Sequence, residues 1–260
     1  MVTGQTPPLE ILPAIDLRGG RCVRLRQGDY DRETVFGDDP AAVARSFVAA
    51  GATRLHVVDL DAARTGERTN AEAIRGIVAA AARPDGSRVP VQLGGGIRDD
   101  GAVRAALDEL GVDRVVVGSA AVKNPDWFAA ACERDPRKLV LGLDYRGGEL
   151  AADGWTAGTG TRARDLAERC AGLPLAAAVC TDIADDGMMA GISESALATL
   201  AVLADLGLPV IASGGVSSYD DVRKVATLRE QHPNVVGAIV GRAIYEGAVT
   251  VEGCIAATRT

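Results

Sequence analysis

The stretch Val89–Asp100, VPVQLGGGIRDD, is a short apolar run that ends in glycines, and Leu208–Asp221, LPVIASGGVSSYDD, repeats the pattern. Glycines directly after an apolar run are typical of the turn between a β-strand and a helix. Two further pairs of strand ends recur at nearly the same offset of roughly 120 residues, which predicts a chain of two similar halves. These pairs are Val117-Gly118-Ser119 with Val240-Gly241-Arg242, and Ile15-Asp16-Leu17 with Leu143-Asp144-Tyr145.

Eight short apolar runs, rich in Val, Ile and Leu, recur along the chain. They are continuous rather than alternating, which indicates parallel strands covered on both faces. Ala-rich stretches with helical spacing lie between them. The expected strands are Ile11–Ile15, Arg54–Leu60, Val89–Leu93, Arg114–Val117, Lys138–Leu143, Ala176–Cys180, Pro209–Ala212 and Val236–Val240. The expected helices are Asp39–Ala50, Asn70–Ala82, Asp100–Leu110, Pro125–Glu133, Thr161–Cys170, Glu194–Leu206 and Ser218–Glu230.

This alternation predicts an α/β fold: a single (β/α)₈ TIM barrel of two similar half-barrels over residues 9–260, after a loose tail over residues 1–8. A doubly wound open sheet is the runner-up, and it would need an edge strand and a single ligand crevice. Asp39 before Pro40 and Asn124 before Pro125 predict helix starts. Helix ends are predicted at Gly51, Gly111 and Gly207.

Composition excludes several classes of protein. Of the 260 residues 47% are hydrophobic and 24% charged, which is ordinary for a globular protein with a large core. The net charge of −7 and the 3% of aromatic residues argue against nucleic acid as a partner. The five cysteines form no CxxC pair, and the chain shows neither a signal peptide nor a membrane-spanning apolar run. We therefore expect a cytosolic protein without disulfides or membrane contact.

The two histidines form no metal-binding motif. His56 lies within a predicted strand, where a satisfied core histidine is the commoner interpretation, and His232 lies in a turn. Neither a P-loop nor a GxGxxG after the first strand is present. We predict no metal and no organic cofactor.

In barrels of this kind the catalytic face is formed by the residues just after each strand. Glycine turns there let backbone N–H groups approach an anion closely, although a glycine in this position more often serves the turn alone. Because adjacent strands carry such turns in both halves, two phosphate sites and a small bisphosphate substrate are expected. One site would consist of Gly95, Gly96, Gly118 and Ser119, and the other of Gly214, Gly215, Gly241 and Arg242.

Asp16 and Asp144 end equivalent strands, between the two predicted phosphate sites. Such a pair can divide a proton transfer, one carboxyl as base and the other as acid. An isolated Asp after a strand more often caps a helix, but the equivalence of the two positions favours catalysis. Asp61 has no counterpart and is expected to be structural. Thr181 after the sixth strand supplies a hydroxyl for the acid or the substrate.

Two long segments interrupt the alternation. Residues 19–39 carry Arg21, Arg24 and Arg26 and are expected to form a loop that could close over an anionic ligand. Residues 146–162 form a polar insert with Trp155, a candidate stacking surface, whereas Trp127 at a helix start is expected to pack.

The chain resembles the phosphoribosylformimino-aminoimidazole carboxamide ribotide isomerases of histidine biosynthesis, from Leu9 to Gly247. The matching stretches are ILPAIDLRGGRCVRLRQGDYDRETVF, LHVVDLDAA, VQLGGGIR, VVVGSAAVKNP, LGLDYRGG with DGW, CTDIADDG, VIASGGVSS and IVGRAIYEG. The resemblance implies a half-barrel-duplicated (β/α)₈ enzyme that needs no cofactor. It implies an Amadori rearrangement of the aminoaldose ProFAR to the aminoketose PRFAR, on a substrate with a phosphate at each end.

Carried over to this sequence, the resemblance implies roles for individual residues. Asp16 would be the general base at the ribose C2 proton, and Asp144 the general acid that opens the furanose ring through its oxygen. Thr181 would assist near the sugar. Further contacts with the substrate are expected from Arg24, Arg98 and Asp186, with Trp155 stacking on the carboxamide-imidazole.

Two positions depart from the family pattern. After CTDI the family usually has a basic residue followed by Asp-Gly-Thr, and here Asp185 and Met188 stand at the basic and Thr positions. This affects the loop after strand six rather than the fold. The alternatives are an isomerase that also accepts phosphoribosyl anthranilate, the sister imidazole glycerol phosphate cyclase, and a non-catalytic phosphosugar-binding barrel. A monomer is expected.

Overall fold

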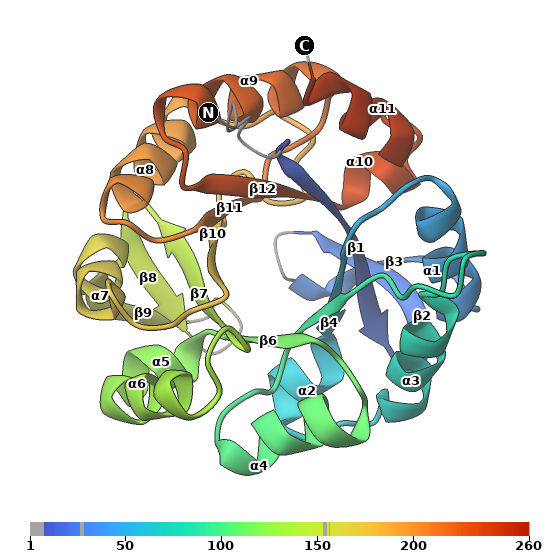
Figure 1. Ribbon diagram of the computed structural model, residues 1–260, viewed down its shortest axis with the longest axis horizontal. Coiled ribbons are helices and arrows are strands. Elements are labelled where there is room, and N and C mark those ends of the chain that lie inside the picture. Colours follow the sequence, from blue (N-terminus) through green and yellow to red (C-terminus); the bar gives the residue numbers. More distant parts are fainter. Residues whose placement is uncertain (1–7, 27–28, 153–154, 156, 260) are drawn as a thin grey trace, which may run out of the picture.

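The computed structural model describes residues 8–26, 29–152, 155 and 157–259. Most of the predicted tail, residues 1–7, lies outside the described residues. Within them the chain forms a ring of strands enclosed by helices (Figure 1).

Eight parallel strands of the described chain close into a barrel, in the order β1, β4, β5, β6, β7, β10, β11, β12. The ring closes where Glu10 of β1 pairs with Gly237 of β12, so the predicted barrel is confirmed and the open sheet is wrong. All eight predicted strands are present within a few residues. Their bounds are β1 Glu10–Arg18, β4 Leu55–Asp59, β5 Val91–Gly94, β6 Arg114–Val117, β7 Leu139–Arg146, β10 Ala177–Asp182, β11 Val210–Ser213 and β12 Val235–Val240.

The helices lie outside the ring of strands (Figure 1). Those expected from the sequence are α1 Pro40–Ala49, α3 Ala71–Ala80, α6 Pro125–Arg134, α7 Ala163–Cys170, α8 Glu194–Asp205 and α9 Tyr219–Gln231. The helix expected over Asp100–Leu110 is divided into α4, Asp100–Arg104, and a π-helical segment η1, Ala105–Glu109. Short helices that the sequence pattern missed are α2 Leu60–Thr65, α5 Ser119–Lys123, α10 Arg242–Tyr245 and α11 Val251–Ala257.

The predicted helix boundaries have the expected local chemistry. The Asp39 side chain accepts from the Ala42 amide at 2.9 Å, and the Asn124 side chain accepts from the Trp127 amide at 3.2 Å. Both caps satisfy backbone N–H groups that the first helical turn leaves unpaired. Positive φ angles are found at the predicted helix ends Gly51, Gly111 and Gly207.

Both long segments fold as antiparallel hairpins, so the expectation of a loop over residues 19–39 was wrong. After β1, strands β2 (Arg21–Arg26) and β3 (Asp29–Gly37) pair with each other, and β2 also pairs with β1. After β7, strands β8 (Glu149–Ala152) and β9 (Ala157–Arg162) pair in the same way. The first and fifth barrel strands therefore each carry a hairpin, which extends the likeness of the two halves.

The core has two parts. The larger lies between helices and barrel, and the smaller lies inside the barrel. The interior part is apolar on the side formed by β1, β7, β10, β11 and β12, where its residues are Leu12, Ala14, Val140, Ala177, Val179, Ile211 and Ile239. On β4, β5 and β6 the buried residues include His56, Gln92 and Arg114, so this part of the barrel is polar.

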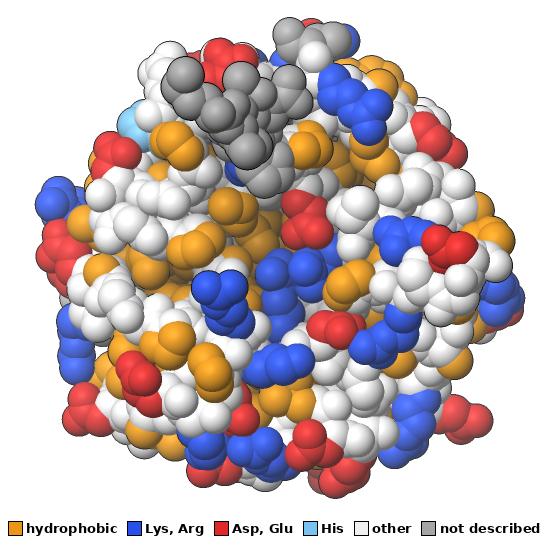
Figure 2. Space-filling model, in the orientation of Figure 1, with side chains coloured by type: hydrophobic (Ala, Val, Ile, Leu, Met, Phe, Trp, Pro, Cys, Tyr) orange, Lys and Arg blue, Asp and Glu red, His pale blue; other side chains and the backbone are white. Residues whose placement is uncertain are grey.

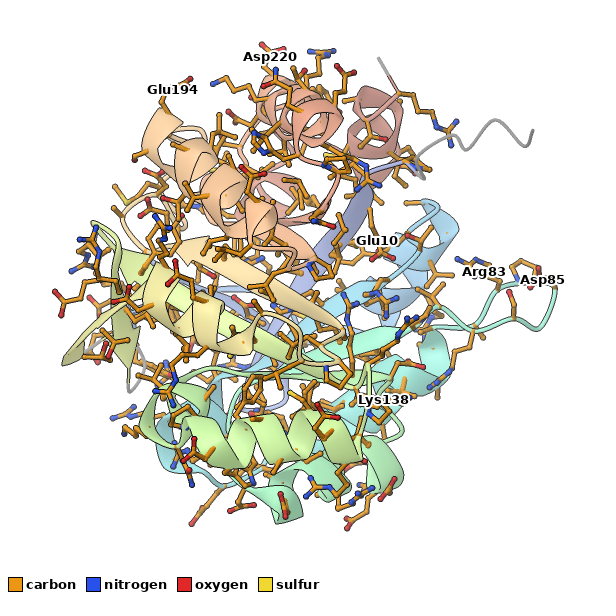
Figure 3. The ribbon with its side chains drawn as sticks, turned by 60° about the vertical axis from the view of Figure 1, so that its left-hand side comes forward. Glu10, Arg83, Asp85, Lys138, Glu194 and Asp220 are labelled. Carbon is orange, nitrogen blue, oxygen red and sulfur yellow. The ribbon has the colours of Figure 1, made fainter. Side chains whose placement is uncertain are left out.

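Charged side chains are scattered over the face seen in Figure 2. Glu194 and Asp220 lie on the outer helices and Asp85 on a projecting loop (Figure 3). Lys and Arg side chains gather near the centre of the face seen in Figure 2. No described helix is long and apolar enough to span a membrane.

Candidate active site

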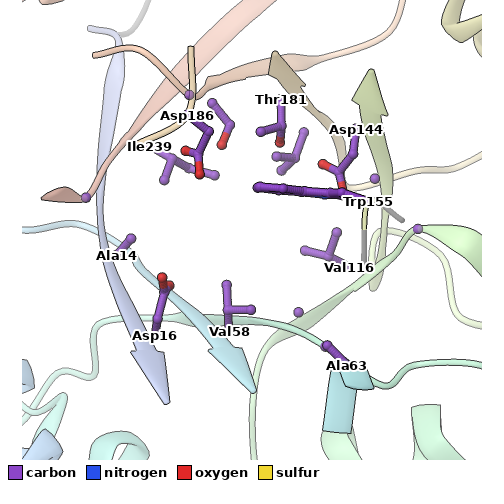
Figure 4. Close-up of a pocket in the computed structure, with 18 of the residues that line it drawn as sticks. Ala14, Asp16, Val58, Ala63, Val116, Asp144, Trp155, Thr181, Asp186 and Ile239 are labelled. Carbon is purple, nitrogen blue, oxygen red and sulfur yellow. The ribbon is translucent and has the colours of Figure 1, made fainter. Parts of the chain in front are cut away.

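A cavity of about 300 Å³ lies within the ring of strands and is bordered by the residues that follow them. Asp16 and Asp144 lie on opposite sides of it (Figure 4). Every candidate site residue predicted from the sequence lines this cavity. These residues are Asp16, Arg24, Gly95, Gly96, Arg98, Gly118, Ser119, Asp144, Trp155, Thr181, Asp186, Gly214, Gly215, Gly241 and Arg242.

Asp16 forms a partly buried ion pair with Arg24 of the first hairpin. Arg24 Nη1 donates to Asp16 Oδ2 at 2.5 Å, and the two side chains are 15% and 13% exposed. Burial raises the pKa of Asp16, and the charge and hydrogen bond of Arg24 oppose this rise. The ion pair therefore favours the ionised form of a carboxyl group that is largely shielded from solvent.

Arg24 fits into space left by a glycine. A Cβ on Gly241 would overlap the Arg24 guanidinium, so the absence of a side chain there permits the ion pair. The Tyr245 ring lies 5.6 Å from the Arg24 guanidinium, and its hydroxyl donates to the Ala14 carbonyl at 3.0 Å. Two buried nitrogens of Arg24, Nε and Nη2, have no partner among the described residues, which suits them to an anionic ligand.

Asp144 receives two hydrogen bonds on the other side of the cavity. The Trp155 indole Nε1 donates at 3.0 Å, and the Thr181 hydroxyl donates from the neighbouring strand, where Thr181 pairs with Asp144. Burial raises the pKa of Asp144, and both hydrogen bonds oppose the rise. In Figure 4 the Trp155 ring lies across the cavity beside Asp144. The second hairpin thus provides a partner for Asp144, as the first does for Asp16.

Asp186 places a third carboxyl in the cavity, from the loop after β10 (Figure 4). Burial raises the pKa of Asp186 to about 6; Arg24 opposes the rise, whereas Asp16 and Asp144 add to it. Because three carboxyls share one enclosed space, they titrate as a coupled set, and at least one of them holds a proton more readily than a free Asp does.

The two glycine pairs have matching conformations. Gly95 and Gly96 have φ angles of 96° and 70°, and Gly214 and Gly215 have angles of 80° and 78°. Cβ atoms at these positions would overlap backbone atoms at the end of the preceding strand or in the segment that follows it, so the turns require glycine for steric reasons as well. Gly118 and Gly241 also match, with φ, ψ of −97°, −102° and −116°, −99°.

Two arginines border the cavity with their guanidinium groups partly bound. Arg98 Nη2 donates to the Ala63 carbonyl at 2.9 Å. Arg242 donates to the Gly187 carbonyl at 2.6 Å and pairs with Glu246 at 2.8 Å. Asp61 does not line the cavity.

Asp61 instead holds the start of the first hairpin. Its Oδ2 accepts from the Gly19 amide at 2.8 Å and from Asn70 Nδ2 at 2.9 Å, in agreement with the structural role expected for it. Trp127 packs partly against the core and donates to Asp100 at 2.7 Å.

The two departures from the family pattern differ in position. Asp185 lines the cavity, and its Oδ2 accepts from the Ser193 amide at 3.2 Å. Met188 does not line it, whereas Met189, with a φ of 56°, does. Met188, which stands where the family usually has Thr, is therefore not part of the cavity lining.

Sequence reasoning did not assign His56, Tyr30 or Ser217 to the cavity, although all three border it. His56 was interpreted as a core histidine, and it is buried and bound to Gln92, but it also borders the cavity. Its place on the inward-facing side of β4, two residues before Val58, was the available signal. Within the described residues no group of three or more His, Cys, Asp or Glu side chains could hold a metal ion.

Comparison with known proteins adds independent findings. A family model described as "Histidine biosynthesis protein" matches residues 10–250. A protein of Acidiphilium cryptum is 46% identical over 95% of this chain and 97% of its own length. One of Thiobacillus denitrificans is 47% identical over 92% of each, and one of Rhodopirellula baltica is 44% identical over 95% and 93%. All three are named 1-(5-phosphoribosyl)-5-((5-phosphoribosylamino)methylideneamino)imidazole-4-carboxamide isomerase.

Proposed function

The chain belongs to the histidine biosynthesis protein family, and we propose that it is the isomerase that converts the aminoaldose ProFAR to the aminoketose PRFAR, with aspartates as acid and base. The name of the relatives supports the reaction, because the chain matches them over nearly the whole length of both. The relationship that carries the mechanism is the position of Asp16 and Asp144 across one enclosed cavity (Figure 4).

The rearrangement takes up a proton at the ring oxygen and at C1 of the sugar, and releases one from C2 and one from the C2 hydroxyl. An acid protonates the furanose ring oxygen while the bond from C1 to that oxygen breaks, which leaves a protonated imine at C1. A base then removes the proton from C2, and the resulting enolamine takes a proton at C1 and loses the proton of its C2 hydroxyl, which gives the ketone. Atoms and electrons balance without an oxidant, so acid and base groups suffice.

Asp16 is the proposed base. Its ion pair with Arg24 favours the carboxylate form, and its burial makes that carboxylate a stronger base than an exposed one. Asp144 is the proposed acid, since burial favours its protonated form. Asp186, with its pKa of about 6, is the second carboxyl that could hold the proton. Trp155 and Thr181 orient Asp144 by their hydrogen bonds.

The matched glycine turns are the proposed phosphate sites. Gly95, Gly96 and Gly118 border one part of the cavity, and Gly214, Gly215 and Gly241 the other. Because they line the same cavity as the aspartates, a substrate held by a phosphate at each end would cross between Asp16 and Asp144. Binding energy at both ends would orient the reacting sugar.

The reaction is tested by an assay of the purified protein with ProFAR and, side by side, with phosphoribosyl anthranilate. Conversion of ProFAR is expected; conversion of both would identify a dual isomerase. Asp16→Asn should reduce kcat by at least about a thousandfold while affinity for the bisphosphate persists. Asp31→Asn, at an exposed position on the same hairpin, is the matched control.

The identity of the acid is tested by a second pair of variants. If Asp144 is the acid, Asp144→Asn loses turnover as Asp16→Asn does, and Asp186→Asn retains more of it. The reverse order would assign the acid to Asp186. An unchanged rate in Asp16→Asn would refute the acid–base assignment. A wild-type protein that binds the bisphosphate but does not convert it would favour a barrel that only binds phosphosugars.

We further propose a cytosolic monomer. Both phosphate sites and both aspartates come from one chain, so no second subunit is needed to complete the cavity. Size-exclusion chromatography with light scattering would measure the mass directly, and a dimer would contradict the proposal.

A further inference from the structure

One rung of the barrel, meaning a row of residues paired in register across adjacent strands, has polar side chains in the barrel interior. His56 on β4 pairs in register with Gln92 on β5, and Gln92 pairs with Arg114 on β6. The three residues are 8%, 0% and 9% exposed. Buried polar groups cost free energy unless they are hydrogen-bonded, so such a rung calls for an explanation.

Packing alone does not require this polarity. The equivalent rung of the second half-barrel lies on β10, β11 and β12 and has the same register. It consists of Val179, Ile211 and Gly237. Since apolar residues and a glycine fill the matching places, a barrel of this shape closes without His56, Gln92 and Arg114.

The hydrogen bonds along the rung fix the orientation of the Gln92 amide. Arg114 Nε lies 2.6 Å from Gln92 Oε1. A guanidinium group only donates, so the amide atom facing it must be the oxygen. Gln92 Nε2 then donates to His56 Nδ1 at 2.8 Å. The Nδ1 atom accepts, and the neutral imidazole carries its proton on Nε2.

A charged His56 does not fit this arrangement. Protonated imidazole would turn an N–H group toward the Gln92 amide N–H group. Burial, with a smaller contribution from the positive charges of Arg24 and Arg114, lowers the pKa of His56 to about 3. His56 is therefore an uncharged donor throughout the physiological pH range.

The free edge of His56 belongs to the cavity wall. His56 borders the cavity, and among the described residues no hydrogen bond is made by its Nε2. Two of its neighbours are small: Ala14, its register partner on β1, has only a methyl group, and Gly94, two residues beyond Gln92, has no side chain. His56 also lies two residues before Val58, the register partner of Asp16.

We propose that His56 binds the substrate: its Nε2–H donates to an oxygen of the sugar that Asp16 deprotonates, and Gln92 and Arg114 are positioning residues that hold the imidazole in this tautomer. This inference rests on the proposed isomerase function. An uncharged donor suits the place, because it holds a sugar hydroxyl without adding a second cation beside the base. The hydrogen bonds from Arg114 through Gln92 to His56 thereby connect the barrel interior to the reacting sugar.

The tautomer is tested by ¹⁵N NMR of ring-labelled histidine. The chain has two histidines, so the variant His232→Gln leaves His56 as the single signal. His232 contacts Asp205, and neither residue lines the cavity, so the His232→Gln variant should keep full activity. The expected spectrum has an unprotonated Nδ1 and a protonated Nε2 from pH 5 to 8. A proton on Nδ1 would overturn the inference.

A second variant checks the source of that tautomer. In Gln92→Glu the carboxylate only accepts, so it draws a proton onto Nδ1 of His56. The Nδ1 signal should change from the unprotonated to the protonated type. An unchanged signal would show that Gln92 does not set the tautomer, and would overturn its positioning role.

The substrate contact is tested by two amide variants. The Gln side chain is one methylene longer than Asn, so His56→Gln can present a donor near the place of Nε2, whereas His56→Asn cannot. His56→Asn should lose kcat/KM for ProFAR by about 10- to 100-fold, the range for one missing donor at a buried site. His56→Gln should stay within about threefold of wild type. Both variants bury one amide, so equal thermal unfolding midpoints would exclude a folding defect.

The outcomes separate this inference from the proposed function. A wild-type protein that leaves ProFAR unchanged would overturn the proposed function, and the sugar contact with it. A wild-type protein that is active while His56→Asn is equally active would overturn the contact alone. If both amide variants lose activity equally with unchanged unfolding midpoints, the donor role is likewise refuted.

Discussion

Arg24 Nη1 lies 2.5 Å from Asp16 Oδ2 in the mouth of the barrel. Arg24 belongs to the first hairpin, whose strand β2 pairs with β1, the strand that carries Asp16. Across the cavity Trp155 donates to Asp144 at 3.0 Å from the second hairpin. Each half-barrel thus pairs its aspartate with a donor from its own hairpin. The donors differ in charge, a cation beside Asp16 and a neutral indole beside Asp144, and this difference favours an ionised Asp16 and a protonated Asp144.

Replacing Arg24 should make Asp16 harder to ionise. In Arg24→Gln the buried carboxylate loses its cation, so the acid limb of the kcat/KM profile should move to higher pH by about 1–2. Activity at pH 7 should fall by about 10- to 100-fold. The matched control is Arg18→Gln, which removes an ion pair with Glu33 on the same hairpin. If kcat/KM falls at every pH and its acid limb stays at the same pH, Arg24 contributes to substrate binding and not to the ionisation of Asp16.

Replacing Trp155 should weaken the support of Asp144. Trp155→Phe keeps an aromatic ring but removes the indole donor, and the pKa of Asp144 should rise because that hydrogen bond lowers it. We expect kcat/KM to fall by about 3- to 10-fold. Trp127→Phe is the control, since Trp127 also donates to an aspartate, Asp100, but outside the cavity. Equal rates in both variants would contradict the role of Trp155.

Substitutions of the glycines in the first proposed phosphate site should have two different effects, one on stability and one on substrate binding. Gly95 has a positive φ and no room for a Cβ beside the Asp59 carbonyl, so Gly95→Ala should lower the free energy of unfolding by about 2–4 kcal/mol. A Cβ on Gly118 would meet no atom within 4 Å. Gly118→Ala should therefore unfold like wild type but raise KM for ProFAR by roughly tenfold or more.

Urea unfolding and steady-state kinetics measure the two effects. If Gly118→Ala binds substrate normally, Gly118 does not belong to the phosphate site. If Gly95→Ala is as stable as wild type, neither the positive φ at this position nor the closeness of the Asp59 carbonyl requires a glycine.

The regular part of the molecule follows from the sequence. Continuous apolar runs predict buried parallel strands, and the repeated Gly95 and Gly214 turns predict the paired sites. The hairpins do not follow, because the segments after Arg18 and Arg146 are rich in Gly and charged residues, which local pattern assigns to loops. Nor does the role of His56 follow, because a histidine in a strand has the same local pattern whether its ring faces core or cavity. The two-residue spacing places His56 and Val58 on one face of β4, but only the closed barrel shows that this face borders the cavity.

The pH dependence of stability should depend on Asp186. Its pKa is about 6 in the folded protein against an ordinary value of 3.8, so between these values the folded state binds more protons than the unfolded state. Stability must then fall as pH rises through this window, by up to about 3 kcal/mol for a buried group. Asp186→Asn cannot ionise and escapes this loss. Its free energy of unfolding relative to wild type should grow from pH 4 to pH 8, as measured by urea unfolding, with the exposed Asp31→Asn as control. A difference that stays constant over this range would show that Asp186 is already ionised at pH 4, and would remove it as a candidate acid.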